Sequence, residues 1–156
     1  MRPAQLQPIM THREAHKDNF TISTDKSKLD LMSIHEFLSK ATDWALGIPI
    51  DTVKKSIENS LCFGVYDQGQ QIGFARVISD FSTIAYLGDV YVLNEYRGKG
   101  LSKWLMEEIM NHPNLQGLRR WILLTNTAEW LYKKFGFTEI PNPEFYMEKH
   151  DPNVYK

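Results

Sequence analysis

The chain has 156 residues, a mass of 18.2 kDa and 42% hydrophobic residues, which is enough for one globular domain with its own core. Its 18 basic and 19 acidic residues nearly cancel, which argues against a nucleic acid or a membrane surface held by bulk charge. Cys62 is the only cysteine, so an internal disulfide and a thiolate metal cluster are excluded. No apolar run approaches the roughly 18 residues of a membrane span and the start lacks a signal-peptide pattern, so we expect a cytoplasmic protein.

Residues 1–19 predict an N-terminal tail or arm, because two prolines and many polar residues leave little periodicity. His12 and His16 have the spacing of two metal ligands on one helix face, but no third ligand accompanies them and we predict no metal site. A single folded domain is expected over residues 20–150, followed by a short tail over residues 151–156.

The first part of this domain predicts a strand and two helices. Residues 20–24 alternate apolar and hydroxylic side chains, as a half-buried strand does. A helix that opens near Asp25 is expected to end by Thr42. Asp51 is a candidate N-cap for a second, shorter helix that reaches about residue 59.

A β-hairpin is predicted next, with strands over residues 61–66 and 71–79. Arg76 shares one face of its strand with apolar neighbours, and a charge in that position needs a partner. Asp80 and Asp89 are the candidate partners. A structural ion pair and the binding of an acidic substrate group both remain open.

The most informative stretch covers residues 87–110. An apolar, β-branched run ends at Val92, and a turn then leads through Gly98 and Gly100 into a helix with regularly spaced apolar residues. The first turn of such a helix has unpaired N–H groups and a partial positive charge, and glycines let a phosphate approach the backbone closely. Basic side chains flank both glycines, so the stretch suits a diphosphate-bearing cofactor.

Two motifs in this order resemble the GNAT superfamily of N-acetyltransferases. Motif A of the family, Q/R-x-x-G-x-G/A, reads here Arg97-Gly98-Lys99-Gly100-Leu101-Ser102, with Ser where the family prefers Gly or Ala. Motif B, a helix that carries Leu-Tyr and is ended by Gly-Phe, is matched by residues 128–137. The chain is therefore identified as a member of this superfamily, with acetyl-CoA as its expected co-substrate.

The resemblance implies an α+β fold, a three-layer α/β/α arrangement around a mixed, mostly antiparallel central sheet. The fourth and fifth strands, predicted over residues 84–92 and 121–125, splay apart in this family, and the pantetheine arm of coenzyme A lies in the gap like an added strand. The pattern then predicts a helix around Tyr132 that ends at Gly136, and a last strand over residues 145–149.

The resemblance also implies the cofactor contacts. The Val90 N–H is expected to donate a hydrogen bond to the thioester oxygen. Asn126 lies near the place of an asparagine that contacts the pantetheine in many members, although Thr125 has the usual spacing from the motif B tyrosine. The expected cofactor-binding residues are Val90, Tyr91, Val92, Arg97, Gly98, Lys99, Gly100, Leu101, Ser102, Lys103, Asn126 and Tyr132.

Acetyl transfer from a thioester to an amine requires stabilisation of the oxyanion, an acid for the departing thiolate and a neutral amine. Val90 is the expected oxyanion donor. Tyr132 occupies the family's position for the acid, and a purely structural core aromatic is the alternative. Asp89 is the first candidate for the general base and Asp80 the second, while Tyr86 sits where some members place a glutamate base.

The candidate acceptor-binding residues are Trp44, Arg76, Asp80 and Tyr86. The resulting hypothesis is an N-acetyltransferase that acetylates a primary amine of a small molecule or amino-acid-like acceptor by direct transfer in a ternary complex. A protein amine as acceptor and a non-catalytic acyl-CoA-binding regulatory module are the alternatives. We expect a monomer or homodimer without nucleic-acid or membrane partners.

Overall fold

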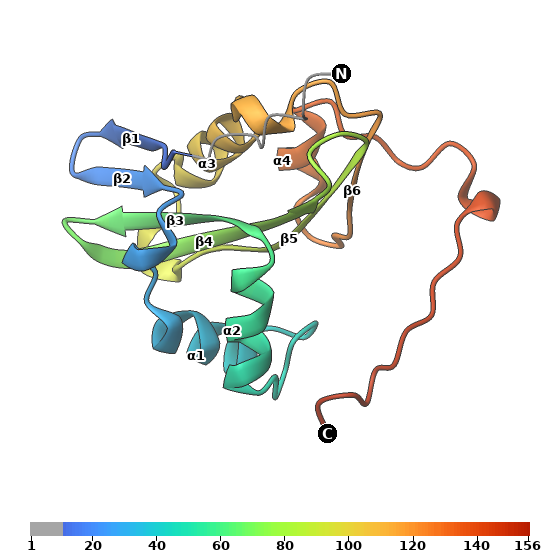
Figure 1. Cartoon of the computed structure of the whole chain (residues 1–156), viewed down its shortest axis with the longest axis horizontal. Helices are drawn as coiled ribbons and strands as arrows, with labels where there is room; N and C mark the ends of the chain where they lie inside the picture. The colour runs from blue at the N-terminus through green and yellow to red at the C-terminus, as the bar shows by residue number, and fades with distance from the viewer. Residues whose placement is uncertain (1–10) are drawn as a thin grey trace, which may run out of the picture.

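The computed structural model describes residues 11–156, and a six-stranded sheet forms the middle of the molecule (Figure 1). The strands lie side by side in chain order, antiparallel from the first to the fifth, and the sixth is parallel to the fifth. Their bounds are β1 Glu14–Lys17, β2 Phe20–Ser23, β3 Leu61–Asp67, β4 Gln70–Ser79, β5 Ile84–Val92 and β6 Arg120–Leu123.

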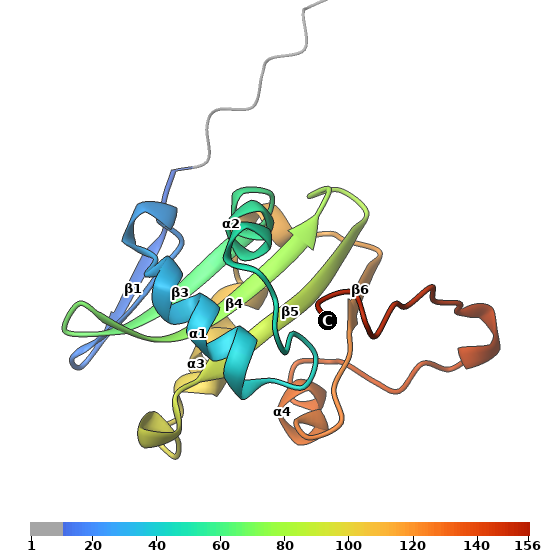
Figure 2. The ribbon, with the colours of Figure 1, turned by 90° about the horizontal axis from the view of Figure 1, so that it is seen from below.

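Two helices cover each face of the sheet (Figures 1 and 2). Helices α1 (Leu31–Ala41) and α2 (Ile50–Glu58) pack on one face, and α3 (Leu101–Met110) and α4 (Glu129–Lys133) lie on the other. One buried apolar cluster fills the space beneath each helix pair, with Leu105 of α3 on one side and Ile34 of α1 on the other. The predicted three-layer α+β fold is confirmed.

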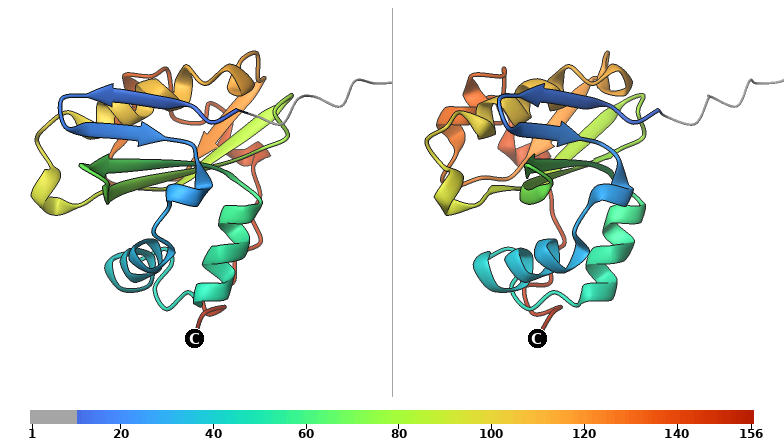
Figure 3. Two further views of the ribbon diagram at one scale, coloured as in Figure 1. Left: turned by 60° about the vertical axis from the view of Figure 1, so that its left-hand side comes forward. Right: turned by 90° about the vertical axis from the view of Figure 1, so that its left-hand side faces the viewer.

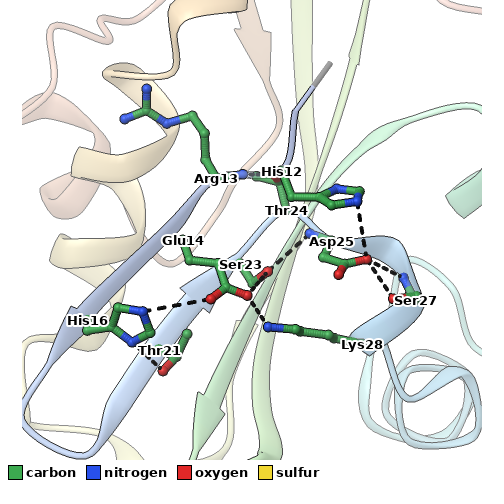
Figure 4. Close-up of polar contacts among 10 residues, drawn as sticks. All are labelled: His12, Arg13, Glu14, His16, Thr21, Ser23, Thr24, Asp25, Ser27 and Lys28. Atoms are coloured by element: carbon green, nitrogen blue, oxygen red, sulfur yellow. Dashed lines mark hydrogen bonds and ion pairs between the residues drawn. The ribbon is translucent and has the colours of Figure 1, made fainter. Parts of the chain in front are cut away.

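The sheet begins earlier than the sequence predicted, because Glu14–Lys17 forms a hairpin with β2 instead of continuing the tail (Figure 3). Polar contacts hold this hairpin: Glu14 accepts hydrogen bonds from Ser23 and Lys28, and His16 contacts the Thr21 hydroxyl at 3.0 Å (Figure 4). The prediction for residues 1–10 lies outside the described residues.

The two histidines singled out in the sequence face different partners. His12 lies 3.8 Å from Asp25, whereas His16 contacts Thr21 and Glu14 (Figure 4). Within residues 11–156, no group of three histidine, cysteine or acidic side chains could hold a metal ion. The helices of that range are also too short or too polar to cross a membrane.

The two helices of the first pair start at other residues than predicted, α1 later and α2 earlier. Asp25 caps only the 3₁₀ turn Lys26–Lys28, while the Asp30 side chain accepts a hydrogen bond from Ser33 N–H and caps α1. Asp51 lies in the first turn of α2, where its charge favours the helix dipole, and Pro49 occupies the cap position. Several polar side chains precede α1, so the pattern could not fix the residue at which that helix starts.

The predicted strand over residues 145–149 is wrong. Pro143–Phe145 forms a 3₁₀ turn, and the chain beyond it continues without pairing to the sheet. Pro141 and Pro143 lack N–H donors and fix their φ angles, which keeps the connecting chain from turning back as a regular hairpin. The alternating pattern predicted a strand, but it could not show whether that strand has a partner.

Candidate active site

Strands β5 and β6 pair over only half of β5. Their parallel register runs from Ile84 opposite Arg120 to Leu87 opposite Leu123, and it ends there. Residues 88–92 therefore have no register partner on the β6 side. This confirms the predicted splay and leaves the backbone of Val90 at an open edge, where an extended ligand can pair with it.

A β-bulge distorts the same part of β5. On the β4 side, Phe74 pairs with Tyr91 and Arg76 pairs with Gly88, so Asp89 and Val90 together oppose one residue. Asp89 has a φ of +54°, in the left-handed region that non-glycine residues rarely adopt. The bulge was not predicted, because nothing in the alternation of residues 84–92 indicates an extra residue.

The Asp89 carboxylate is the centre of a polar network. Arg76 Nε donates to Asp89 Oδ2 at 2.8 Å, and Trp44 Nε1 donates to Asp89 Oδ1 at 3.0 Å. Arg76 also donates to the Ser60 hydroxyl at 3.1 Å. The Arg76 and Asp89 side chains are only 17% and 12% exposed, so the pair neutralises two largely buried charges. Of the two predicted partners of Arg76, Asp89 forms the ion pair and Asp80 does not. The contact with Ser60 was not predicted.

Asp80 is engaged elsewhere. One carboxylate oxygen accepts hydrogen bonds from the N–H groups of Ser82, Thr83 and Ile84, and the other accepts from the Thr83 hydroxyl. These bonds, above all those from Thr83, hold the pKa of Asp80 far below its usual value. Asp80 is therefore a weak base that stabilises the turn between β4 and β5, and the structure does not bring it to Arg76.

The remaining acceptor candidates lie around the Asp89 network. Trp44 contacts Asp89 through its indole nitrogen, yet 56% of the residue is exposed. Tyr86 shares a strand face with Gly88, which is opposite Arg76. Burial raises the pKa of the Tyr86 hydroxyl, and the nearby Asp89 charge adds to that rise. Three of the four predicted acceptor-binding residues thus gather at the bulge, and Asp80 does not.

The predicted phosphate loop is open. Gly98 and Gly100 have φ values of +79° and +75°, and a Cβ built on either would meet no atom within 4 Å. Gly100 is the N-cap of α3 and no side chain caps the helix, so the first N–H groups of α3 face outward. Arg97, Lys99 and Lys103 are exposed beside them. An anion could occupy the space that a Cβ would fill.

Other predicted cofactor contacts are restricted by packing. The Tyr91 ring is buried and stacks on Phe37 with 3.8 Å between ring centroids, and the Val92 side chain is buried in the core. Leu101 is buried and Ser102 is half-buried at the start of α3. Tyr91 and Val92 are therefore available to a ligand in the splay mainly through their backbones.

Tyr132 lines a pocket of about 180 Å³ between β6, α4 and the chain that follows. Its ring meets Phe137 edge-on at 6.0 Å, and burial raises the pKa of its hydroxyl. Thr125 accepts a hydrogen bond from Ala128 N–H at 3.1 Å in the turn before α4, whereas Asn126 is exposed. This leaves Asn126 the freer of the two side chains for a ligand.

Comparisons with known proteins decide the family. The family model of the acetyltransferase (GNAT) domain matches residues 58–139, which include both motifs and the bulge. The chain belongs to the GNAT family of acetyltransferases. A Gibberella zeae protein named provisionally as an acetyltransferase is 32% identical over 140 residues, covering 76% of this chain and 78% of that protein.

Solved structures agree with this assignment. A Xanthomonas campestris pv. campestris protein described provisionally as a GNAT-family acetyltransferase is 51% identical, covers 90% of this chain and 99% of its own, and has a TM-score of 0.86. A Clostridium acetobutylicum acetyltransferase crystallised with acetyl-CoA has a TM-score of 0.56, covering 91% of this chain and 96% of its own. At 17% identity, the second likeness shows the fold alone.

Proposed function

We propose that this GNAT acetyltransferase transfers the acetyl group of acetyl-CoA to a primary amine of a small-molecule acceptor. Two stretches of backbone with free hydrogen-bonding groups carry the proposal. One is the half of β5 that has no partner on the β6 side, and the other is the start of α3, which no side chain caps. The first suits the pantetheine arm and the second suits the diphosphate. Acetyl-CoA would supply the thioester whose acetyl group is transferred.

The backbone and basic side chains would bind the donor. The N–H groups at the start of α3 face the diphosphate, with Arg97 and Lys99 adding positive charge. The Val90 N–H, displaced by the bulge, donates to the thioester oxygen and stabilises the oxyanion that forms there. Lys103 and Asn126 are exposed and available for the outer parts of the cofactor.

Tyr132 is the proposed acid for the departing thiolate. Burial raises its pKa above the ordinary value of 10.0, so the hydroxyl keeps its proton at neutral pH. Asp89 is the proposed base: each of its oxygens accepts one hydrogen bond and retains a lone pair that can take a proton from the amine through water. Trp44 and Tyr86 would wall the acceptor site beside it.

Direct transfer is favoured over an acetyl-enzyme. Cys62 is almost completely buried beneath α2, and burial raises its pKa to about 11, so it is a poor nucleophile. A protein amine as acceptor remains the runner-up within the class. The cytoplasmic location remains a prediction from the sequence.

The test combines binding with turnover on the full chain. Calorimetry with acetyl-CoA should show saturable binding, and a panel of primary amines should include acceptors that release free coenzyme A, measured by thiol detection. Binding without turnover on any small amine or on peptide amines would favour the non-catalytic acyl-CoA-binding module. Absence of binding would contradict the donor assignment itself.

A further inference from the structure

Helices α1 and α2 cover only part of their side of the sheet (Figure 2). The buried cluster beneath them includes Phe74 from β4 and Tyr91 from β5. Farther along the same two strands, towards the turn that joins them, the sheet extends past both helices (Figure 2). An uncovered stretch of sheet therefore lies next to Arg76 and Asp89.

Apolar and aromatic side chains line this uncovered stretch. Ile78 of β4 lies opposite Tyr86 of β5, which lies opposite Ile122 of β6, and Ile84 shares their face because it precedes Tyr86 by two residues. Their neighbours along the strands belong to the cluster on the α3 side: Val77, Ala85 and Leu87. Ile78 and Ile84 are 45% and 40% exposed, and the other two are half-buried. We call these four side chains the apolar face, and such a group of exposed apolar side chains indicates a surface that binds something.

Three charged groups border the apolar face, and each is already engaged. Arg76 binds the Asp89 carboxylate at one end. Asp80, at the other end, accepts hydrogen bonds from its own turn through both oxygens. The Arg120 guanidinium lies 5.9 Å from the ring centroid of Tyr146. None of these three is set aside for a carboxylate or a second ammonium group of an acceptor.

We propose that the acceptor is an arylalkylamine, an aromatic ring joined to a primary amine by a short alkyl chain. The ring lies on the apolar face and the amine reaches Asp89, so this inference rests on the proposed acetyl transfer. Ile78 and Tyr86 lie two strand residues from Arg76 and its partner Gly88, which is about 7 Å along the sheet and fits a two-carbon linker with a ring.

Trp44 completes the site for an aromatic ring. Its indole is fixed by the hydrogen bond to Asp89, yet 56% of the residue is exposed, so the ring can pack on an aromatic group beside that carboxylate. An amino acid with the same ring would bring an unpaired carboxylate against apolar side chains, which costs free energy. A short aliphatic diamine would leave the apolar face uncovered.

Turnover of the full chain with acetyl-CoA compares 2-phenylethylamine, phenylalanine and 1,4-diaminobutane. We expect kcat/KM for 2-phenylethylamine to exceed each of the other two by about tenfold or more, because only this amine buries a ring without burying a charge. A higher kcat/KM for phenylalanine or for the diamine would overturn the inference and leave the acetyl transfer itself in place.

The double variant Ile78→Ser/Ile84→Ser removes apolar surface without adding charge. Both side chains are partly exposed, so the variant should fold, as circular dichroism would verify. It should raise KM for 2-phenylethylamine by about tenfold, with kcat and the acetyl-CoA affinity measured by calorimetry unchanged. The control Met32→Ser, 67% exposed on α1, should leave KM unchanged. A native KM in the folded double variant would overturn the inference.

Methyl NMR tests the apolar face without turnover. In the presence of saturating coenzyme A, 2-phenylethylamine should shift the methyl signals of Ile78, Ile84 and Ile122 and leave that of Ile34, fully buried beneath α1, unchanged. These shifts without turnover on any amine would contradict the proposed acetyl transfer but support binding of the ring on the apolar face. Absence of the shifts would overturn the acceptor class even if other amines are acetylated.

Discussion

The two halves of β5 show how one strand can serve both structure and chemistry. Residues 85–87 pair with β4 on one side and β6 on the other, in regular register. Residues 88–92 have a bulge on the β4 side and no partner on the β6 side. The first half is held by strands on both sides, and the second half is where we propose that backbone groups and the Asp89 carboxylate meet the ligands. The predictions below separate these two roles.

Tyr132→Phe should have the largest effect on turnover. Loss of a general acid typically costs between about 10² and 10⁴ in rate, while the ring that packs on Phe137 is kept. We expect kcat to fall by that amount with acetyl-CoA affinity unchanged, measured by thiol release and calorimetry. The matched control is Tyr66→Phe, which removes a buried hydroxyl without a partner in the described structure and should leave kcat unchanged. An equal loss of kcat in both variants would indicate that the hydroxyl of Tyr132 matters for packing and not as an acid.

Gly100→Ala should weaken acetyl-CoA binding by roughly tenfold or more, since a Cβ would occupy space that we propose for the diphosphate and the residue would be strained at φ +75°. Gly117→Ala is the matched control: its φ is +72°, it also has open space around it, and it lies before β6, away from the loop. Calorimetry should show weak binding for the first variant only. If the two variants bound acetyl-CoA with equal affinity, the proposal that the diphosphate binds at the start of α3 would be wrong.

Arg76→Leu and Asp89→Asn separate the structural role of the ion pair from its chemical role. The first leaves a largely buried carboxylate without its cation and should lower the free energy of unfolding by about 2 kcal/mol. The second keeps an oxygen that can accept from Trp44 or Arg76, so it should be less destabilising and yet lower kcat by about tenfold or more. Full turnover in Asp89→Asn would remove Asp89 as the base.

The smallest effect concerns acid stability. The pKa of Asp80 is depressed in the folded chain, so its stabilising contribution is present above its unfolded value of about 3.8 and is lost as pH falls below it. The side chain is exposed, so the loss should be modest. Asp80→Asn should flatten the fall in melting temperature between pH 4 and lower values, and turnover at pH 7 should stay native. Reduced turnover of this variant at pH 7 would indicate that Asp80 takes part in catalysis.

The sequence predicted those parts of the molecule that depend on local residue order. Gly98 and Gly100 before an apolar periodicity indicated the loop and the start of α3, and the alternation around Arg76 indicated a charge that needs a partner. The bulge at Asp89 could not be predicted, because an extra residue in a strand leaves the apolar pattern almost unchanged.

Contacts between distant segments were also beyond the sequence. The bond from Trp44 to Asp89 joins residues 45 positions apart, and only the packing of the loop between α1 and α2 against the bulge brings them together. The segment over residues 145–149 has the alternation of a strand but no partner strand within residues 11–156. Periodicity reports which face of a segment is apolar, and tertiary structure decides what covers that face.

Hydrogen exchange resolved to single amides, with and without acetyl-CoA, tests the central claim most directly. We predict that acetyl-CoA slows exchange at the amides of residues 88–92, which have no partner on the β6 side, and of residues 101–103. The amides of residues 85–87, which have partners in both β4 and β6, should change little. Protection in the first half of β5 alone, or no change at the start of α3, would contradict the account.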